Sequence, residues 1–418
     1  MTHTPVWRAA ALLLLLLSAG CATPPARDQT DASPPAAQRV IVLSFDGLPA
    51  AAATDGSMPA LRALGDAGVR AAWLSPSYPS LTFPNHYTLA TGLRPDHHGI
   101  VHNYLRDPGY GRFWSKRNGS EARWYGGDPI WNTLQRQGGR AATVMWIGAQ
   151  DPADPRRPAL WTAFDAAQPA DARIDQMLAW LDLPPARRPR LLMAYFDRHD
   201  VDAHAHGPAS PEAMAARRAL DGALQRLLDG LDARGLRAGS DVVVVSDHGM
   251  AQVPPRNVEL LTRAVPRSAY EVEGSNIVLG IHPRPGQDAA VEAALVGRHG
   301  HHACYRKAEL PARWHYGTHP RVAPIVCQAD AGWYLYADAP ARRATAMRGE
   351  HGYDPDDPSM RAVFVAAGPS FRAGTRLPAF DNVDLYPLLA RLLGIRPSPN
   401  DGDIAPLLPA LRDAPPAR

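Results

Sequence analysis

Residues 241–245 read DVVVV and are followed by Ser246-Asp247-His248-Gly249, and this stretch decides the fold. Four consecutive valines lack the polar alternation of a half-exposed strand, so we expect a strand covered on both faces, as in a parallel sheet. Further strands are predicted at residues 39–45 (RVIVLSF), 141–146, 191–196 and 361–366. Helical patterns lie at residues 58–69, 82–91, 210–230 and 383–393. This alternation predicts an α/β sandwich around a mostly parallel central sheet.

The stretch from about residue 252 to residue 345 breaks this rhythm. It contains proline-rich turns, two cysteines and β-like runs at residues 277–281 and 333–336. We therefore expect a smaller subdomain inserted into a catalytic domain of residues 39–410, with a short tail at residues 411–418. The length of the chain after its amino-terminal segment suits one large domain with such an insertion, or two domains.

The amino-terminal segment has the pattern of a targeting signal. Arg8 precedes an apolar run at residues 9–17, which is shorter than the roughly 20 residues that a membrane-spanning helix needs. Small residues at positions 18–20 lead to Cys21 and resemble a bacterial lipobox. We expect a signal peptide (1–21), a lipid anchor on Cys21, a flexible tether (22–38) and a periplasmic location, with the outer membrane favoured. Cleavage and release without a lipid is the alternative.

Charge and cysteine content narrow the classes of partner. The formal charge is +3, and the basic residues are scattered, so we expect no nucleic-acid partner. No protein partner is evident. Cys304 and Cys327 would lie in an oxidising compartment, which predicts a disulfide between them, with two buried thiols as the alternative.

Carboxylate and imidazole groups follow the predicted strands. In an open α/β sheet, ligands bind beyond the carboxyl ends of the strands. Six such groups lie in segments that we expect to converge there: Asp46, Asp200, His204, Asp247, His248 and His351. Each alone is more often structural, but together they would repel or be costly to bury without a cation. Ligands without cysteine suit zinc at a hydrolytic site, or manganese as a second choice.

Thr82 lies at the predicted start of a helix, where free N–H groups and the helix dipole favour an anion. A metal ion bound to its Oγ would lower the pKa of this alcohol and make it a nucleophile. Two metal ions can hold the attacking and leaving oxygens of a displacement at phosphorus. The combination predicts phosphoryl-type transfer.

These segments resemble the nucleotide pyrophosphatase/phosphodiesterase family of the alkaline phosphatase superfamily, and in particular its small bacterial lipoprotein-type members. The resemblance spans about residues 39–410 and implies an alkaline-phosphatase-like sandwich. The matching segments are Ser80-Leu81-Thr82-Phe83-Pro84-Asn85-His86-Tyr87, Thr91-Gly92-Leu93-Arg94-Pro95, His98-Gly99-Ile100 with Asn103, Asp200 to His204 with Gly207-Pro208, Ser246-Asp247-His248-Gly249-Met250, His351-Gly352-Tyr353-Asp354, Asn382-Val383-Asp384-Leu385-Tyr386 and Asn400-Asp401-Gly402.

The resemblance implies a role for each matching residue. One zinc ion would be held by Asp200, His204 and His351, and the other by Asp46, Asp247 and His248 next to Thr82. Thr82 would form a covalent nucleotidyl intermediate. Asn103 would donate a hydrogen bond to a phosphate oxygen, with a turn residue as the alternative. Phe83 would face one side of the nucleobase, with simple packing under its helix as the alternative. For the other side we favour Phe164 over Trp161. The product would be a nucleoside 5′-monophosphate.

Other activities are possible on the same scaffold. A phosphomonoesterase would need additional positive groups to bind the dianionic phosphate of its substrate. The chain contains only two lysines, Lys116 and Lys307, and its sequence shows no third cluster of metal ligands. An arylsulfatase would need a cysteine or serine in the nucleophile segment, which Thr82-Phe83-Pro84-Asn85 does not supply. A choline-headgroup phosphodiesterase and a zinc-binding surface lipoprotein without activity remain as alternatives.

Overall fold

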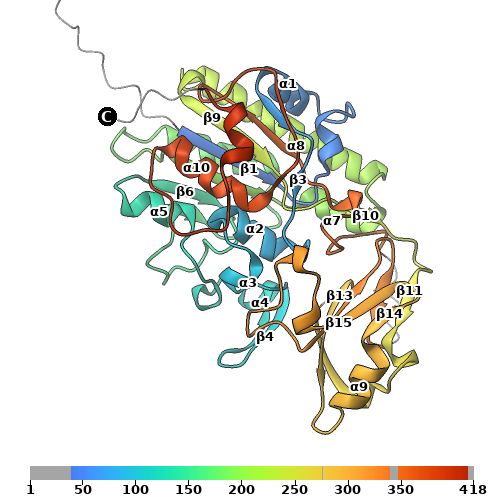
Figure 1. Ribbon diagram of the computed structural model, residues 1–418. Helices are drawn as coiled ribbons and strands as arrows, with labels where there is room; N and C mark the ends of the chain where they lie inside the picture. Colours follow the sequence, from blue (N-terminus) through green and yellow to red (C-terminus); the bar gives the residue numbers. More distant parts are fainter. Residues whose placement is uncertain (1–38, 275, 339–346, 413–418) are drawn as a thin grey trace, which may run out of the picture. The chain divides into compact units, whose positions relative to one another are not determined.

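The computed structural model describes residues 39–274, 276–338 and 347–412 (Figure 1). The expected signal peptide, Cys21 and the tether lie outside the described residues. Within the described part of the chain, no helix combines the length and the apolar character needed to cross a membrane.

The centre of the fold is an eight-stranded sheet with the order β20-β2-β19-β9-β1-β8-β6-β7. Neighbouring strands are parallel, except that β19 is antiparallel to both β9 and β2. The expected mostly parallel α/β architecture is confirmed. The strands are β1 (Arg39–Phe45), β2 (Val69–Ala71), β6 (Ala141–Val144), β7 (Leu160–Thr162), β8 (Leu191–Phe196), β9 (Ser240–Val245), β19 (Phe364–Ala367) and β20 (Thr375–Leu377).

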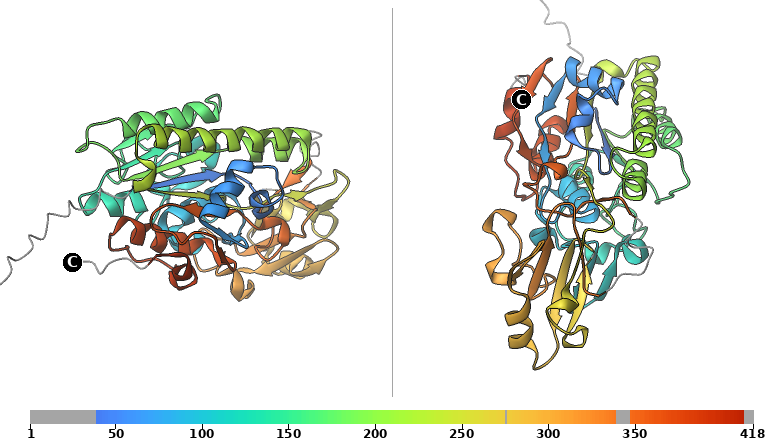
Figure 2. Two further views of the ribbon diagram at one scale, coloured as in Figure 1. Left: turned by 90° about the horizontal axis from the view of Figure 1, so that it is seen from above. Right: turned by 90° about the vertical axis from the view of Figure 1, so that its right-hand side faces the viewer.

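Burial explains the apolar runs of the middle strands. β1 lies between β8 and β9, with Val42 opposite Met193 on one side and Val243 on the other. Every residue of β8 and β9 is buried, because helices cover both faces of the sheet. Figure 2 shows α8 (Pro211–Ala233) and α10 (Leu385–Leu393) on opposite faces. The remaining helices are α1 (Pro59–Ala67), α2 (Thr82–Thr91), α3 (Pro95–His98), α4 (Ser115–Asn118), α5 (Ile130–Arg136), α6 (Ala170–Leu181), α7 (Arg198–His206) and α9 (Asp288–Leu295).

Some element ends differ from those expected. The strand predicted at residues 361–366 begins only at Phe364, because Ala362 instead forms isolated bridges with Pro49 and Leu74. The helix predicted at residues 383–393 begins at Leu385, after a short 3₁₀ turn (Asn382–Asp384). In contrast, β1, β8 and α2 have the predicted bounds.

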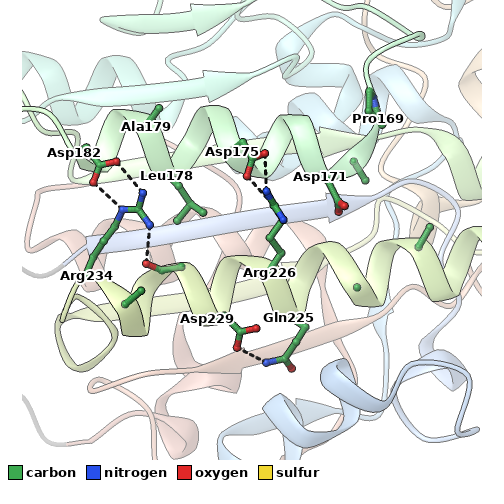
Figure 3. A pocket seen from close by; sticks show the side chains of 15 residues that line it. Pro169, Asp171, Asp175, Leu178, Ala179, Asp182, Gln225, Arg226, Asp229 and Arg234 are labelled. Atoms are coloured by element: carbon green, nitrogen blue, oxygen red, sulfur yellow. Dashed lines mark hydrogen bonds and ion pairs between the residues drawn. The ribbon is translucent and has the colours of Figure 1, made fainter.

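Helices α6 and α8 lie side by side on one face of the sheet and border an open groove of about 1030 Å³ (Figure 3). Two bidentate ion pairs cross it: Arg226 contacts Asp175 at 2.7 and 2.9 Å, and Arg234 contacts Asp182 at 2.7 and 2.8 Å. These pairs are solvent-exposed, so each contributes little to stability.

A long excursion of the chain begins and ends at one pair of short strands. β10 (Ala251–Gln252) pairs with β18 (Gly349–Glu350), and we call this pair the neck. Between its strands the chain forms a five-stranded antiparallel sheet, seen in yellow and orange in Figure 1. A disulfide joins Cys304 to Cys327, which are opposite each other on β15 and β16. The strands of the excursion are β11 (Val258–Leu260), β12 (Tyr270–Gly274), β13 (Val278–Pro283), β14 (Gly297–His299), β15 (His302–Arg306), β16 (Ile325–Ala329) and β17 (Tyr334–Tyr336).

Three small strand pairs complete the described structure. Within the excursion, β11 pairs with β17 in parallel. β4 (Tyr104–Asp107) and β5 (Gly111–Trp114) form a hairpin directly after Asn103. β3 (Leu74–Ser75) pairs with β21 (Phe380–Asp381) near the start of α2.

Candidate metal centre and active site

Three neighbouring parallel strands bring the acidic residues together. Asp46 directly follows β1, Asp247 follows β9 after one residue, and α7 with Asp200 follows β8. Because β1 pairs with both β8 and β9, these three positions meet at one edge of the sheet. Asp200 and His204 lie within α7 and not in a loop, and their spacing of four residues places them on the same helix face.

The first cluster consists of Asp200, His204 and His351, whose ligand atoms lie within 4.8 Å of one another. His204 Nε2 is 3.4 Å from Asp200 Oδ2, and His351 Nε2 is 3.7 Å from Asp200 Oδ1. The Nδ1 atoms lie 2.8 Å from backbone oxygens, that of His204 from Gly349 O and that of His351 from Ser80 O. Since a carbonyl can only accept, both Nδ1 atoms carry the proton, and both Nε2 atoms are free to bind a metal ion.

The second cluster consists of Asp46, Asp200 and His248, again with ligand atoms within 4.8 Å. Asp247 adjoins it, with Oδ2 2.9 Å from His248 Nε2. Asp200 therefore belongs to both clusters, whereas the resemblance placed it with only one metal ion. Asp46 is held by the hydroxyl of Tyr195, which donates to its Oδ2 at 2.6 Å.

Burial makes this cluster of carboxylates costly without positive charge. Burial, together with the charges of Asp247 and Asp200, raises the pKa of Asp46 well above its ordinary value. Burial also raises the pKa of Asp200. Among the described residues, Asp46 Oδ1 and Asp200 Oδ1 are buried oxygens without a hydrogen-bond partner. Such oxygens are expensive to bury unless a cation binds them. The six Asp and His groups therefore fit one or more divalent metal ions.

The histidines are also affected by their neighbours. Burial and the nearby His248 and His204 hold the pKa of His351 well below its ordinary value, and its ring stacks on that of His248 at 3.6 Å. Burial lowers the pKa of His204, but the charges of Asp200 and Glu350 outweigh this effect and leave it raised. The neutral imidazole is the form that binds a metal ion, so a cation would replace the proton favoured at His204.

Thr82 and Asn103 lie beside these clusters. Thr82 is the first residue of α2 and is 9% exposed, and its Oγ1 lies 3.3 Å from His248 Nε2. The backbone N–H of Phe83 donates to Asn103 Oδ1 at 3.0 Å. Because the N–H must face the oxygen, the amide group of Asn103 is oriented, and its Nδ2 remains available for a phosphate oxygen. The structure thus brings the expected nucleophile, its anion-binding partner and all six expected ligands together.

Comparison with known families agrees with this geometry. The family model described as type I phosphodiesterase / nucleotide pyrophosphatase matches residues 40–354. The chain belongs to this family. The expected family and the expected enzyme class, phosphoric diester hydrolase, are confirmed at this level.

Individual members of the phosphodiesterase family show the same relationship. An uncharacterised pyrophosphatase/phosphodiesterase of Schizosaccharomyces pombe is 34% identical over 90% of this chain and 80% of its own length. A venom phosphodiesterase of Crotalus durissus collilineatus is 31% identical over 87% of this chain, and rat ectonucleotide pyrophosphatase/phosphodiesterase family member 3 is 32% identical over 87%. The chain spans 45% and 43% of the length of these last two proteins.

Solved structures of the family have the same fold. Murine ectonucleotide pyrophosphatase/phosphodiesterase 5, as an inactive threonine-to-alanine variant in complex with AMP, matches with a TM-score of 0.84 and 31% identity. The match covers 90% of this chain and all of that one. The human protein matches with a TM-score of 0.84 and 29% identity, again over 90% of this chain and all of the other.

Two expected aromatic residues lie near this phosphodiesterase site. Phe83 is half-buried and contacts Phe113 edge to face, with ring centroids 6.0 Å apart. A Cβ at Gly119 would lie 2.7 Å from its ring, so the glycine leaves room for it. Phe164 is 48% exposed, and its ring lies 6.2 Å from that of Tyr195. Trp161 lies within β7, next to the loop that carries Phe164.

The sequence predicted no role for Tyr195 and no metal-ligand role for His86. His86 is fully buried, with Nδ1 3.0 Å from Thr82 O and 3.2 Å from Asp247 Oδ2, and Nε2 2.9 Å from Ser44 Oγ. One signal was available for Tyr195, because it lies at the end of the strand that precedes Asp200. Asp202, two residues from Asp200, forms an ion pair with Arg198 at 2.7 Å.

Proposed function

We propose that this chain is a zinc-dependent nucleotide pyrophosphatase/phosphodiesterase that releases nucleoside 5′-monophosphates. The observation that carries this proposal is the position of Thr82 Oγ1, 3.3 Å from His248 Nε2, beside the cluster of Asp46, Asp200 and His248. The AMP complex of the inactive threonine variant of a related protein supports both the nucleotide and the threonine.

Two zinc ions suit the donor set. Asp200, His204 and His351 would hold one ion, and Asp46, Asp247 and His248 the other, with Asp200 within reach of both. When bound, the ions supply positive charge to the phosphate oxygens and lower the pKa of a hydroxyl group.

The side chains of the protein would act in two displacements. Thr82 Oγ loses its proton to solvent and forms a bond to phosphorus while the bond from phosphorus to the leaving group breaks, which gives a covalent nucleotidyl-threonine; the leaving group departs as its anion or takes a proton from solvent. A water molecule then attacks phosphorus and loses a proton, and the bond to Thr82 Oγ breaks as that oxygen regains a proton. Two inversions give net retention. Asn103 Nδ2 donates to a non-bridging oxygen in both steps.

The base would lie between two aromatic rings. Phe83 follows Thr82 directly, and Phe164 extends from the neighbouring loop with half of its surface exposed. A ring on each face of a nucleobase stabilises it by stacking without selecting one base strongly.

Thr82→Ala and Thr82→Ser test the proposal on protein that lacks residues 1–21. The p-nitrophenyl ester of thymidine 5′-monophosphate should be cleaved much faster than phenyl phosphate or a phosphocholine ester. Thr82→Ala should lose at least about 10³-fold in kcat, while its zinc content and Tm stay near those of the unchanged protein. Thr82→Ser keeps a hydroxyl and should retain measurable turnover. Unchanged turnover in Thr82→Ala would refute the nucleophile, and a preference for the monoester or phosphocholine would refute the substrate class.

We also propose an exported, lipid-anchored protein of the bacterial lipoprotein type. The small residues before Cys21 support this location. In a bacterial host that processes lipoproteins, Cys21→Ser should move the protein from the membrane fraction to the soluble fraction. Equal membrane association of both forms would argue against the anchor.

A further inference from the structure

Arg173 is a buried cation that the mechanism above does not use. It is the fourth residue of α6 and is 3% exposed. Its Nη1 donates to Tyr195 O at 2.8 Å, and its Nη2 lies 2.9 Å from Asp197 Oδ1. Both partners are at the carboxyl end of β8, immediately before the helix that carries Asp200. The guanidinium is therefore attached to the edge of the sheet where the phosphate would bind.

The same guanidinium also holds the loop that carries Phe164. Its Nε donates to Gln168 O at 3.1 Å, and its Nη2 donates to Asp165 O at 3.3 Å. On the other side of the loop, the N–H of Phe164 donates to Gln150 Oε1 at 2.7 Å. The backbone is thus held both at Phe164 and directly after it, while the ring itself is half exposed.

We infer that Arg173 is a positioning residue for the nucleobase, which it serves by fixing the loop of Phe164 to the carboxyl end of β8. This inference rests on the proposed function. A stacking ring on a loop contributes to binding only if the loop is ordered before the nucleotide arrives. A planar fork of donors can bind several carbonyl groups at once, which explains why an arginine lies here. Arg173 touches no substrate atom and acts only through Phe164.

Arg173→Lys tests this inference with two substrates. Lysine keeps the charge beside Asp197 but cannot reach three carbonyl groups with one ammonium group. For the p-nitrophenyl ester of thymidine 5′-monophosphate, kcat/KM should fall by at least about tenfold, mainly through KM. For bis(p-nitrophenyl) phosphate, which has no nucleobase, kcat/KM should stay within about twofold of the value of the unchanged protein. The Kd of AMP, measured by calorimetry, should rise with the KM.

Arg190→Lys is the matched control. Arg190 directly precedes the first residue of β8, at the end of the strand away from the site, and its Nη2 donates to Leu393 O. Arg190→Lys should leave the ratio of kcat/KM for the two substrates unchanged. A double-mutant cycle with Phe164→Ala adds a second readout, because two residues that act through one ring should give losses that are not additive.

The outcomes separate the two proposals. If the unchanged protein does not prefer the nucleotide ester over bis(p-nitrophenyl) phosphate, the proposed nucleotide function fails. Suppose instead that the unchanged protein has that preference. The positioning role alone then fails if Arg173→Lys lowers kcat/KM equally for both substrates or for neither. It also fails if the losses of Arg173→Lys and Phe164→Ala are additive. A selective, non-additive loss supports it.

Discussion

At the scale of single residues, the charged form of Asp46 is unfavourable unless a cation binds beside it. Burial and two neighbouring carboxylates raise its pKa, so the protein without metal ions is destabilised there. In excess chelator, Asp46→Asn should therefore be at least about 1 kcal/mol more stable than the unchanged protein, because the amide removes one charge. Urea unfolding measures this difference.

With zinc added, the order should reverse, since the amide of the Asp46→Asn variant binds a cation less well than a carboxylate does. Asp229→Asn, on the exposed face of α8, is the control and should change neither value. A loss of stability in chelator for Asp46→Asn would contradict the predicted charge repulsion.

We expect His98 to make the free energy of unfolding fall at acid pH. It is 1% exposed, and its Nδ1 accepts the N–H of Ile100 at 3.1 Å, so the folded state requires neutral imidazole. Burial lowers its pKa from 6.5 to about 3. Because the unfolded chain binds the proton more tightly, stability is complete above pH 6.5 and falls progressively between pH 6.5 and 3. At pH 5 the loss should be about 2 kcal/mol.

His98→Gln should remove this part of the pH dependence, whatever its effect at pH 7.5, because glutamine does not titrate. The measurement is the free energy of unfolding in denaturant at pH 7.5, 6 and 5. The partly exposed His301, which stacks on Trp333, provides the control variant, His301→Gln. An equal slope for His98→Gln and the unchanged protein would overturn the prediction.

Residue types in a pattern predicted much of the site but not its inner contacts. Asp46, Asp247 and His248 were identifiable because they follow apolar runs that could only be buried strands. The contact of Tyr195 with Asp46 and the shared position of Asp200 depend on strand register and on the rotation of α7. Register and rotation depend on tertiary packing, and the hydrophobic periodicity of the sequence does not predict them.

At the scale of elements, α2 owes its end to one glycine. Gly92 has φ +65°, and its N–H donates to Thr88 O at 2.8 Å. A Cβ there would lie 2.7 Å from Tyr386 Cβ. Gly92→Ala should therefore destabilise the protein by about 2–4 kcal/mol, through left-handed backbone strain and overpacking.

Gly222 provides the opposite case within α8. A Cβ there would meet no atom within 4 Å, so Gly222→Ala should stabilise the protein by about 1 kcal/mol through helix propensity. Thermal or urea unfolding of both variants measures the contrast. Similar changes for the two glycines would mean that the surroundings of Gly92 do not matter as described.

Elements differed in how well they could be predicted. β1, β8 and α2 had unambiguous patterns: unbroken apolar runs, and a helix with a glycine after its last residue. The hairpin β4–β5 and helix α6 were not predicted. β5 has only four residues, of which only Phe113 is buried, so its stability comes from tertiary contacts and not from a local pattern.

At the scale of the whole molecule, the disulfide fastens only the excursion. Cys304 and Cys327 are 23 residues apart in the sequence, and the disulfide restricts this loop in the unfolded chain. Replacement of both by alanine should therefore lower the free energy of unfolding by about 3 kcal/mol. Because every expected metal ligand lies outside that sheet, the double variant should keep zinc and nucleotide hydrolysis at 25 °C while its Tm falls. Loss of zinc from a folded double variant would contradict this separation.

The neck has a consequence for the expected metal ligands. Its two strands lie beside each other, with His351 directly after one and His248 three residues before the other. The pairing of Ala251 with Glu350 and of Gln252 with Gly349 brings these two imidazoles to the same end of the excursion. A substitution that breaks the pairing of these two short strands would therefore change the distance between two expected metal ligands, although it touches neither of them.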